Sequence, residues 1–258
     1  MATPSLDSAY WEERYDMKAD GWDLGAPSTP LKTFIDGLTD RDARILIPGC
    51  GRAWEGQYLH ERGFRNVWLM DLTGWPFKDL LERCPGFPKD HLLTGDFFAH
   101  HGQYDLILEQ TFFCALDPTL RDRYVAKMHE LLAPGGRLVG VLFDDPAPGK
   151  DPHGPPFGGS HAEYEARFGT WFQAVRIAPC YNSIAPRAGR EAWIEILKEP
   201  DTPYSPIACA QHDHYLAWAT TRTPVRVEHV APTGATLVNE GTISDVSTAP
   251  DGSEWMTL

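Results

Sequence analysis

The stretch of residues 44–52, Arg-Ile-Leu-Ile-Pro-Gly-Cys-Gly-Arg, constrains the fold of this chain more than any other. A short apolar run ends abruptly at Gly49-Cys50-Gly51, and a helical pattern follows. This order predicts a buried strand, a glycine turn and the start of a helix. Glycine permits positive φ and lets the backbone approach a ligand closely. In an open α/β sheet the turn lies at the carboxyl end of its strand, where ligands bind.

Acidic residues follow the next two predicted strands. Residues 66–70 end in Asp71, and residues 91–94 are followed by Asp96 and Phe97. An acid at the tip of the second strand can accept two hydrogen bonds from a ribose diol. After the third strand, a carboxylate can accept from the exocyclic amine of adenine while the ring stacks nearby. Together these residues predict a nucleoside-containing ligand; the alternative is ordinary turns with loop acids and core phenylalanines.

Strand and helix patterns alternate along most of the chain, which predicts a doubly wound, mostly parallel α/β sheet. Pro134-Gly135-Gly136 is typical of a helix stop before a strand. The expected strands are residues 43–47, 67–70, 91–94, 104–108 and 137–143, with 172–177 and 192–198 at the end of the sheet. The expected helices are residues 8–16, 28–38 (with Ser28 as its cap), 52–62, 75–83, 118–132 and 160–168.

The glycine turn departs from the dinucleotide-binding pattern. Trp54 occupies the place of the third glycine of G-x-G-x-x-G. A tryptophan there would block the close approach of helix and strand that a pyrophosphate site uses. The expected ligand is therefore a nucleoside without a pyrophosphate, and S-adenosylmethionine fits that description.

Composition and charge narrow the function classes. The chain has 258 residues, enough for one large domain or a domain plus a small module. Its net charge of −13 disfavours a nucleic-acid binder, which needs a basic face. The first residues lack the pattern of a signal peptide, and no apolar run is long enough to cross a membrane. Five scattered cysteines without a C-x-x-C pair disfavour a disulfide framework or a zinc site and favour a reducing cytoplasm.

Several motifs, in order and spacing, make about three quarters of the chain resemble the thiopurine S-methyltransferase and halide/thiol methyltransferase family. They are Tyr10-Trp11-Glu12-Glu13-Arg14-Tyr15, Gly21-Trp22-Asp23-Leu24-Gly25, Ile47-Pro48-Gly49-Cys50-Gly51, Tyr104-Asp105-Leu106-Ile107, Thr111-Phe112-Phe113-Cys114-Ala115, Gly154-Pro155-Pro156-Phe157 and His161-Ala162-Glu163. The resemblance implies a class I methyltransferase with a Rossmann-like fold over residues 1–199. It also implies S-adenosylmethionine as methyl donor and a small-molecule acceptor.

The resemblance also assigns residues to the site. It implies that an aromatic N-terminal segment covers the donor, which is the alternative to a segment that only caps the core. It places Gln110 after the fourth strand, where thiopurine enzymes usually carry arginine and halide/thiol enzymes tyrosine. Phe157 stands where halide/thiol enzymes often have tyrosine. The implied donor contacts are Trp11, Tyr15, Trp22, Gly49, Gly51, Asp71, Asp96, Phe97 and Gln110, and the implied acceptor pocket is Trp22, Phe112, Phe113 and Phe157.

The expected reaction needs little acid–base chemistry. A thiolate, selenolate or halide is already nucleophilic at neutral pH, so the protein contributes mainly positioning and exclusion of water. Cys114 lies in an apolar run without a neighbouring histidine, which favours a packing role over a nucleophile. Glu109 is the one candidate base near the fourth strand tip, and a cap or a donor contact is the preferred interpretation. No catalytic residue is assigned, and O- or N-methylation would need a base that the sequence does not identify.

Two further patterns are set aside. Gly154-Pro155-Pro156-Phe157 resembles the N/D-P-P-Y/F motif of nucleic-acid amino methyltransferases, but it follows the fifth strand rather than the fourth. His100, His101, His212 and His214 lack acidic or cysteine partners at metal-ligand spacing, so no metal is expected.

Beyond a linker at residues 199–203, the pattern becomes β-rich, and residues 200–258 are expected to form a separate small module. A short helix at 212–221 and strands at 225–229, 236–243 and 255–258 are expected. Thr202-Pro203-Tyr204-Ser205-Pro206, Thr223-Pro224-Val225-Arg226-Val227 and Gly241-Thr242-Ile243-Ser244-Asp245 are similar to the Rho-binding antiterminator family, a compact Sm-like β module. That family continues with another strand after the position of Leu258, so an incomplete module with an open edge is expected.

Two functions follow from these expectations. The first is an S-adenosylmethionine-dependent methyltransferase that acts on a small soft nucleophile. The alternative is a protein-interaction factor that contacts the transcription termination machinery through residues 202–258, with a weak or silent methyltransferase domain. A module that only stabilises the enzyme or joins two copies of it is the third interpretation of the C-terminal residues.

Overall fold

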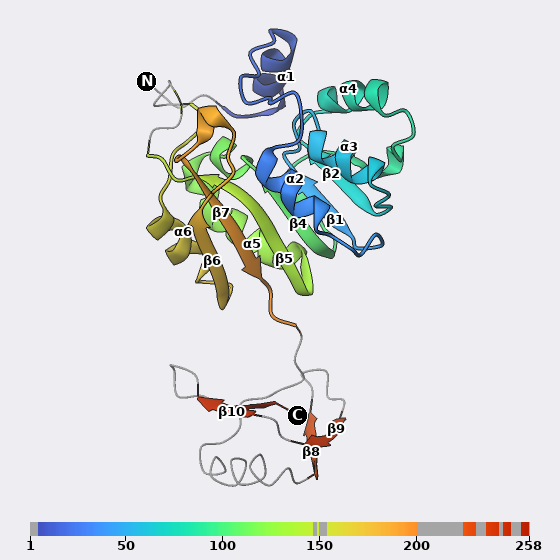
Figure 1. The fold of residues 1–258 in the computed structure, drawn as a ribbon, viewed down its shortest axis with the longest axis vertical. Helices are drawn as coiled ribbons and strands as arrows, with labels where there is room; N and C mark the ends of the chain where they lie inside the picture. The colour runs from blue at the N-terminus through green and yellow to red at the C-terminus, as the bar shows by residue number, and fades with distance from the viewer. Residues whose placement is uncertain are drawn as a thin grey trace. The chain divides into compact units, whose positions relative to one another are not determined.

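A computed structural model describes residues 5–146, 149 and 154–200 and, beyond these, the backbone of four strands within residues 224–257. The chain divides into two compact units, Met1–Pro200 and Asp201–Leu258 (Figure 1). The first unit carries the candidate site.

A seven-stranded sheet forms the centre of the first unit, in the order β3-β2-β1-β4-β5-β7-β6. Strands β3, β2, β1, β4 and β5 run parallel, whereas β7 is antiparallel to both β5 and β6. The strands are β1 Ile45–Pro48, β2 Val67–Asp71, β3 Leu92–Thr94, β4 Tyr104–Gln110, β5 Leu132–Phe143, β6 Ala174–Pro179 and β7 Glu191–Leu197. The predicted doubly wound, mostly parallel sheet with two added strands at its end is confirmed.

Six α-helices lie along the sheet and in the segment before it, close to the predicted positions. They are α1 Ser8–Asp16, α2 Thr29–Asp36, α3 Trp54–Glu61, α4 Trp75–Arg83, α5 Arg121–Leu131 and α6 His161–Phe168. The predicted helix stop before Pro134-Gly135-Gly136 is confirmed, because α5 ends at Leu131. The next strand begins earlier than the predicted residue 137, since Leu132 already pairs with Tyr104, and regular pairing resumes at Arg137 after a register shift. A Cβ on Gly136 would lie 2.9 Å from the carbonyl oxygen of Tyr104, so these glycines allow a close strand approach.

Hydrophobic clusters bury both faces of the sheet. Along β1, Leu46 contacts the cluster that includes α5 and α6, while Ile45 and Ile47 contact the cluster that includes α2, α3 and α4. Successive strand residues point to opposite faces, so burial on both sides explains the continuous apolar run. Each such aliphatic side chain stabilises the fold by about 1.5–3 kcal/mol.

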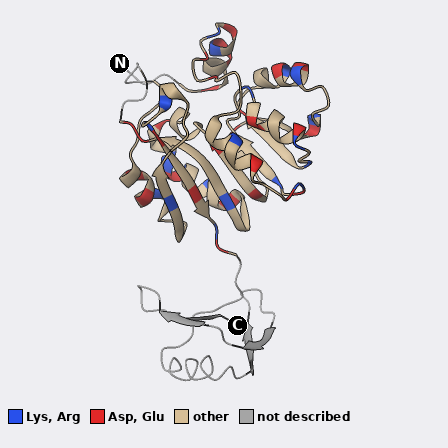
Figure 2. Ribbon diagram, in the orientation of Figure 1, with Lys and Arg blue, Asp and Glu red and all other residues tan. Residues whose placement is uncertain are grey.

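Helices α1 and α4 each carry both acidic and basic residues (Figure 2). No helix among the described residues combines the length and apolar character that a bilayer span requires.

Four strands are described in the second unit. Strands β8 (Pro224–Val230) and β9 (Thr236–Thr242) pair antiparallel, as do β10 (Asp245–Thr248) and β11 (Glu254–Thr257). Three of them fall on the predicted strand segments, and β10 was not predicted. The predicted helix at 212–221 lies outside the described residues. The Sm-like, antiterminator-like module therefore stays a prediction.

Candidate active site

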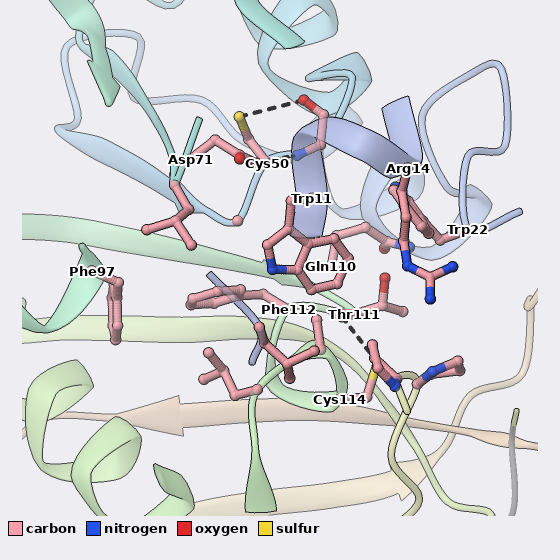
Figure 3. Close-up of a pocket in the computed structure, with 18 of the residues that line it drawn as sticks. Trp11, Arg14, Trp22, Cys50, Asp71, Phe97, Gln110, Thr111, Phe112 and Cys114 are labelled. Carbon is pink, nitrogen blue, oxygen red and sulfur yellow. Dashed lines mark hydrogen bonds between the residues drawn. The ribbon is translucent and has the colours of Figure 1, made fainter. Parts of the chain in front are cut away.

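A cavity of about 1170 Å³ opens at the carboxyl ends of the parallel strands. Gly49, Asp71 and Gln110, which end or follow β1, β2 and β4, line it together with aromatic side chains of the N-terminal segment. Figure 3 shows Asp71 and Phe97 at one end of this group. The position agrees with the rule that ligands of open α/β sheets bind beyond the carboxyl ends of the strands.

The turn after β1 is shaped by two glycines with positive φ. Gly49 has φ +56°, and a Cβ on it would lie 2.1 Å from Cδ2 of Phe112. Gly51 has φ +50°, and its nearest neighbours would be Nε1 of Trp22 at 3.7 Å and the hydroxyl of Tyr15 at 3.9 Å. The glycine turn therefore lies against the ring of Phe112 on one side and beneath two aromatic residues of the N-terminal segment on the other.

Asp71 presents a buried carboxylate at the tip of β2. Its oxygens accept hydrogen bonds from the backbone N–H groups of Gly51 and Thr73, both at 3.2 Å. Burial raises the pKa of Asp71 to about 6, and the two N–H donors oppose that shift. The side chain is only 8% exposed and still lines the cavity, so its charge is directed at whatever occupies the site.

Asp96 and Phe97 lie beside each other at the same end of the cavity. The exposed Asp96 caps a short turn by accepting from the N–H of Phe98 at 2.9 Å. Phe97 is buried, with its ring centroid 5.2 Å from that of Phe112. A carboxylate beside an aromatic face suits a flat, amine-bearing base.

The N-terminal segment contributes an aromatic wall. Trp22 meets Trp11 edge-to-face at 5.5 Å and Tyr15 at 5.7 Å between ring centroids. Tyr15 also stacks on Trp75 of α4 at 4.8 Å, a contact that the sequence did not indicate. Burial and the nearby Asp71 raise the pKa of Tyr15, so its hydroxyl stays protonated as a donor.

Ser28 and Glu55, which were not predicted as site residues, connect the segment to Gln110. The Ser28 hydroxyl donates to Oε1 of Gln110 at 2.8 Å instead of capping α2, and the Ser28 N–H donates to Oε1 of Glu55 at 2.8 Å. Ser28 and Glu55 are buried, and burial raises the pKa of Glu55. With its oxygen occupied by Ser28, the Gln110 carboxamide has its NH₂ group left to donate.

Glu109 organises the turn after β4. It accepts from the N–H groups of Phe112 at 2.6 Å and Phe113 at 3.1 Å and from the hydroxyl of Tyr124. Of the two interpretations offered for Glu109, a cap or a donor contact, these hydrogen bonds agree with the cap. Burial raises its pKa to about 7.

Cys114 lines the cavity, but its thiol is not activated. Its Sγ donates to the carbonyl of Thr111 at 2.9 Å, and burial together with Glu109 raises the pKa of the thiol. Because a thiolate is the nucleophilic form, the expected packing role is confirmed.

The predicted acceptor pocket is only partly assembled as expected. Phe112 and Trp22 line the cavity, whereas Phe113 is fully buried in the core against Tyr124 and Tyr164. The structure thus corrects the placement of Phe113, because the turn at positive-φ Thr111 directs adjacent rings to different sides. Phe157 is joined to this turn by its N–H, which donates to the carbonyl of Cys114 at 2.7 Å.

Other residues complete the cavity wall near Cys114. Among the described residues, the proline pair before Phe157 lines the cavity, as do Phe143 and two arginines that the sequence did not indicate. These residues are Phe143, Pro155, Pro156, Arg187 and Arg190. The mostly buried guanidinium of Arg187 lies 5.4 Å from the ring centroid of Phe143, and Arg190 pairs with Asp145.

The histidines singled out in the sequence lie elsewhere. His100 bonds to the hydroxyl of Tyr104, and His101 pairs with Glu130. His212 and His214 lie outside the described residues.

These features fit the adenosyl part of S-adenosylmethionine. The glycine turn gives close backbone access, Asp71 offers a carboxylate for a diol, and Asp96 with Phe97 offers a site for the base. The aromatic wall suits a positively charged sulfonium, because aromatic faces attract cations.

The sequence matches the family model of thiopurine S-methyltransferase (TPMT) over residues 6–199. It is similar to "Probable thiol methyltransferase 2" of Arabidopsis thaliana, with 30% identity over 71% of this chain and 82% of that protein. It is also similar to "Thiocyanate methyltransferase 1" of Brassica oleracea, with 28% identity over 72% of this chain and 84% of that protein.

A solved structure shares the fold. It is the 1,6-didemethyltoxoflavin-N1-methyltransferase of Burkholderia thailandensis with bound 1,6-didemethyltoxoflavin and S-adenosylhomocysteine. The TM-score is 0.57 at 20% identity, over 75% of this chain and 87% of that one. The likeness supports the predicted Rossmann-like methyltransferase fold.

Proposed function

The chain belongs to the thiopurine S-methyltransferase family, and from this membership we propose that its acceptor is a small sulfur nucleophile. The protein is a methyltransferase that uses S-adenosylmethionine. Relatives named for thiols and thiocyanate support the acceptor class. Selenium or tellurium species and halides share the soft character of these acceptors and are included in the proposal.

One observation supports the acceptor class above the others: the largely buried Arg187 guanidinium lies in the cavity wall, where it also pairs with Glu191 at 3.3 Å. Only 9% of Arg187 is exposed, and it lies beside Phe143. A positive charge in such a place lowers the pKa of a nearby thiol and favours the thiolate. The apolar neighbours strip water from a large, polarisable nucleophile at modest cost.

The donor contacts of the proposal come from three parts of the fold. Asp71 receives the ribose hydroxyls, and Asp96 with Phe97 receives the base. Gly49 and Gly51 give backbone access, while Gln110 donates through its amide. Trp11, Tyr15 and Trp22 close the cavity from the N-terminal side. All of these residues line the one cavity at the strand ends.

The bound donor supplies an electrophilic methyl carbon on a positively charged sulfur. The protein then has to hold the acceptor in line and keep water out, which requires no strong base. Glu109 and Cys114 have structural tasks in the turn after β4, in agreement with this division of labour.

The test is methyl transfer from radiolabelled S-adenosylmethionine to a panel of hydrogen sulfide, thiocyanate, an aromatic thiol, a thiopurine, iodide and selenite. Catechol and a primary amine serve as controls. Label on sulfur acceptors supports the proposal, as does an Arg187→Ala loss that is largest for ionisable thiols at pH values below their pKa. Label only on catechol or the amine contradicts it.

The second unit and the location are separate proposals. For residues 202–258 we keep protein binding as the proposed role, supported only by their paired β strands. Full-length chain and purified transcription termination factor, mixed and analysed by size exclusion, test that role; separate elution contradicts it. A cytoplasmic location is supported by the free thiols of Cys50, Cys84, Cys114 and Cys180.

A further inference from the structure

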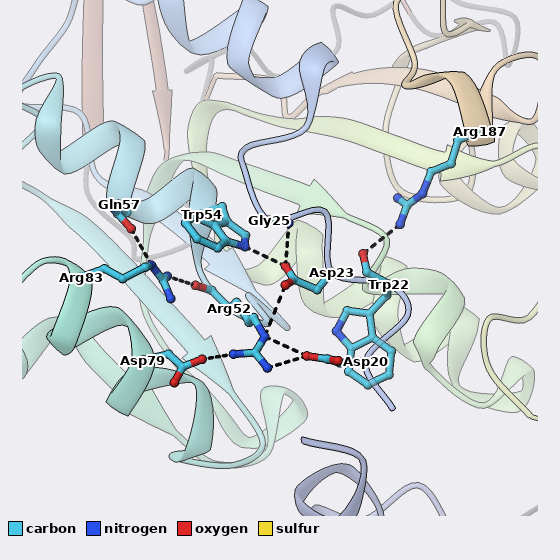
Figure 4. Close-up of polar contacts among 10 residues, drawn as sticks. All are labelled: Asp20, Trp22, Asp23, Gly25, Arg52, Trp54, Gln57, Asp79, Arg83 and Arg187. Carbon is cyan, nitrogen blue, oxygen red and sulfur yellow. Dashed lines mark hydrogen bonds and ion pairs between the residues drawn. The ribbon is translucent and has the colours of Figure 1, made fainter. Parts of the chain in front are cut away.

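Arg52, the residue after the glycine turn, lies at the centre of a cluster of carboxylates (Figure 4). Its Nε and Nη2 donate to Oδ2 of Asp20 at 2.8 and 2.6 Å, and Nε lies 3.4 Å from Oδ2 of Asp23. Its Nη1 bonds to Asp79 of α4. One guanidinium therefore joins the N-terminal segment to two parts of the α/β body.

The acids that Arg52 holds flank Trp22. Asp20 precedes Trp22 by two residues and Asp23 follows it directly, so both ends of the short loop are fixed. Asp23 also accepts from Nε1 of Trp54 at 2.7 Å, and the carbonyl of Trp22 accepts from Nη2 of Arg187 at 3.0 Å. The hydrogen bonds that this loop makes to other elements lead to Arg52, to Trp54 of α3 and to Arg187.

Trp22 and the glycine turn lie against each other in the wall of the same cavity. Nε1 of Trp22 lies 3.7 Å from the position of a Cβ on Gly51. A ligand that lies along the glycine turn beside Asp71 can leave on this side only when the loop moves. The strength of the ties around Arg52 therefore affects how long a ligand stays.

We propose that Arg52 is a positioning residue that latches residues 20–25 and thereby holds Trp22 over the methyl donor. Its task is retention of the donor, whichever acceptor the enzyme uses. The latch adds to affinity because a donor that binds only the closed loop has an apparent affinity proportional to the fraction of closed protein. When that fraction falls, the donor binds more weakly.

The chemistry of the latch requires arginine. A planar guanidinium can bond to several carboxylates in different directions, whereas a lysine ammonium acts as a point charge. The side chains of Arg52, Asp20 and Asp79 are 17%, 14% and 27% exposed. These pairs are partly shielded from solvent, so they are stronger than ordinary surface pairs but still sensitive to salt.

The main experiment measures binding of S-adenosylhomocysteine to the full chain by titration calorimetry. We expect Arg52→Ala to weaken binding about tenfold, the effect of a fall in the closed fraction to about one tenth. The affinity of Arg52→Lys should lie between that of Arg52→Ala and that of the wild type. Amide exchange of residues 17–25 should accelerate in Arg52→Ala, and kcat at saturating donor should change less than twofold.

Matched variants separate the latch from general destabilisation. Arg65→Ala removes an arginine whose pair with Asp42 spans 3.9 Å at an exposed site, with side chains 80% and 76% exposed, and should bind normally. The Asp20→Asn/Asp23→Asn double variant keeps Arg52 and changes only its partners in the loop. It should reproduce the loss of affinity seen in Arg52→Ala, and its affinity should depend less on salt than that of the wild type.

Two results would overturn the proposal. One is unchanged affinity for S-adenosylhomocysteine in the Asp20→Asn/Asp23→Asn variant. The other is a loss in Arg52→Ala without faster exchange in residues 17–25, which would assign the effect to direct donor contact or to the turn itself. Wild-type binding of S-adenosylhomocysteine is measured without an acceptor, so a failure of the latch is distinguishable from a failure of the proposed sulfur acceptor.

Discussion

Replacement of Asp71 by asparagine separates what this carboxylate costs the fold from what it gives to binding. The side chain is buried, and it accepts hydrogen bonds from backbone N–H groups, those of Gly51 and Thr73 at 3.2 Å and that of Leu72. Asparagine has nearly the same shape but carries no charge. We therefore expect a variant that is more stable than the wild type and binds the donor poorly.

The magnitude follows from the pKa of the carboxyl group. Burial raises the pKa of Asp71 from its ordinary value of 3.8 to about 6. At 1.36 kcal/mol per pH unit, this difference corresponds to about 3 kcal/mol of folding free energy lost at neutral pH. In the variant, the NH₂ group of asparagine faces a backbone N–H donor, and this pair of donors offsets ~1–2 kcal/mol of the stabilisation. The expected net stabilisation is about 1–2 kcal/mol, or a rise in Tm of about 2–6 °C.

The pH dependence of stability tests the sign of this effect. The folded chain holds a proton on Asp71 more tightly than the unfolded chain, so the free energy of unfolding of the wild type falls as pH rises from 3.8 to about 6. Asp71→Asn lacks that contribution. Below pH 4 the variant should therefore be ~1–2 kcal/mol less stable than the wild type, because only the cost of the amide remains; the difference should change sign within this window and stay constant above about pH 7.

Thermal unfolding by calorimetry across pH 4–8 measures stability, and titration with S-adenosylhomocysteine measures binding. Loss of the charged hydrogen bonds proposed for the ribose should raise Kd about 100-fold. A variant that melts several degrees lower at pH 7.5, or one with wild-type affinity, would refute the reasoning. The first result would mean that the carboxylate stabilises the fold, and the second that it does not hold the ribose.

Five further variants, at four positions, test the turns around the cavity. Gly49→Ala should abolish donor binding, because its Cβ would lie 2.1 Å from Phe112. Gly51→Ala meets no atom closer than 3.7 Å and should lose only ~1–2 kcal/mol of stability, because of its positive φ. Titration with S-adenosylhomocysteine and melting curves distinguish the two variants. Glu109→Ala leaves a buried hydroxyl and two N–H groups without partners and should lower stability by ~3–5 kcal/mol in denaturant unfolding, while Glu109→Gln should lose much less. Cys114→Ser should keep most of its methyl transfer activity, since the thiol is protonated and bonded to Thr111; loss of all turnover with intact donor binding would contradict this role.

The parts of the site that the sequence indicated are those with local signals. Gly49 and Asp71 stand directly after buried strands, and parallel strands place their carboxyl ends at one edge of the sheet. Asp96 and Phe97 were indicated by the same kind of signal, because they come shortly after β3. The boundary that differs from the prediction is the start of β5: the helix ends before Pro134 as its stop signal indicates, but the pairing of Leu132 with Tyr104 begins the strand five residues earlier than its apolar run.

The parts of the site that the sequence did not indicate are contacts between residues far apart in the chain. Ser28 meets Glu55 across 27 residues and Gln110 across 82, and Arg187 reaches Trp22 across 165. No periodicity records such pairs. The adjacent Phe112 and Phe113 show a different limit: they lie in a turn rather than a strand or helix, so nothing in their spacing indicates which ring faces the cavity.

The same groups that make the fold less stable also make the site ready for its ligand. Asp71 holds a buried charge with backbone donors alone, and the ribose hydroxyls proposed to bind there would solvate it. Arg52 joins the loop that covers this site to the strand ends. Donor binding should therefore stabilise the first unit through both groups, by about 2.7 kcal/mol at a free donor concentration 100 times Kd. Because the stabilisation acts on the closed form, a donor that binds tightly also fixes Trp22 in place before any acceptor arrives, and water is excluded at the moment when the methyl group becomes reactive.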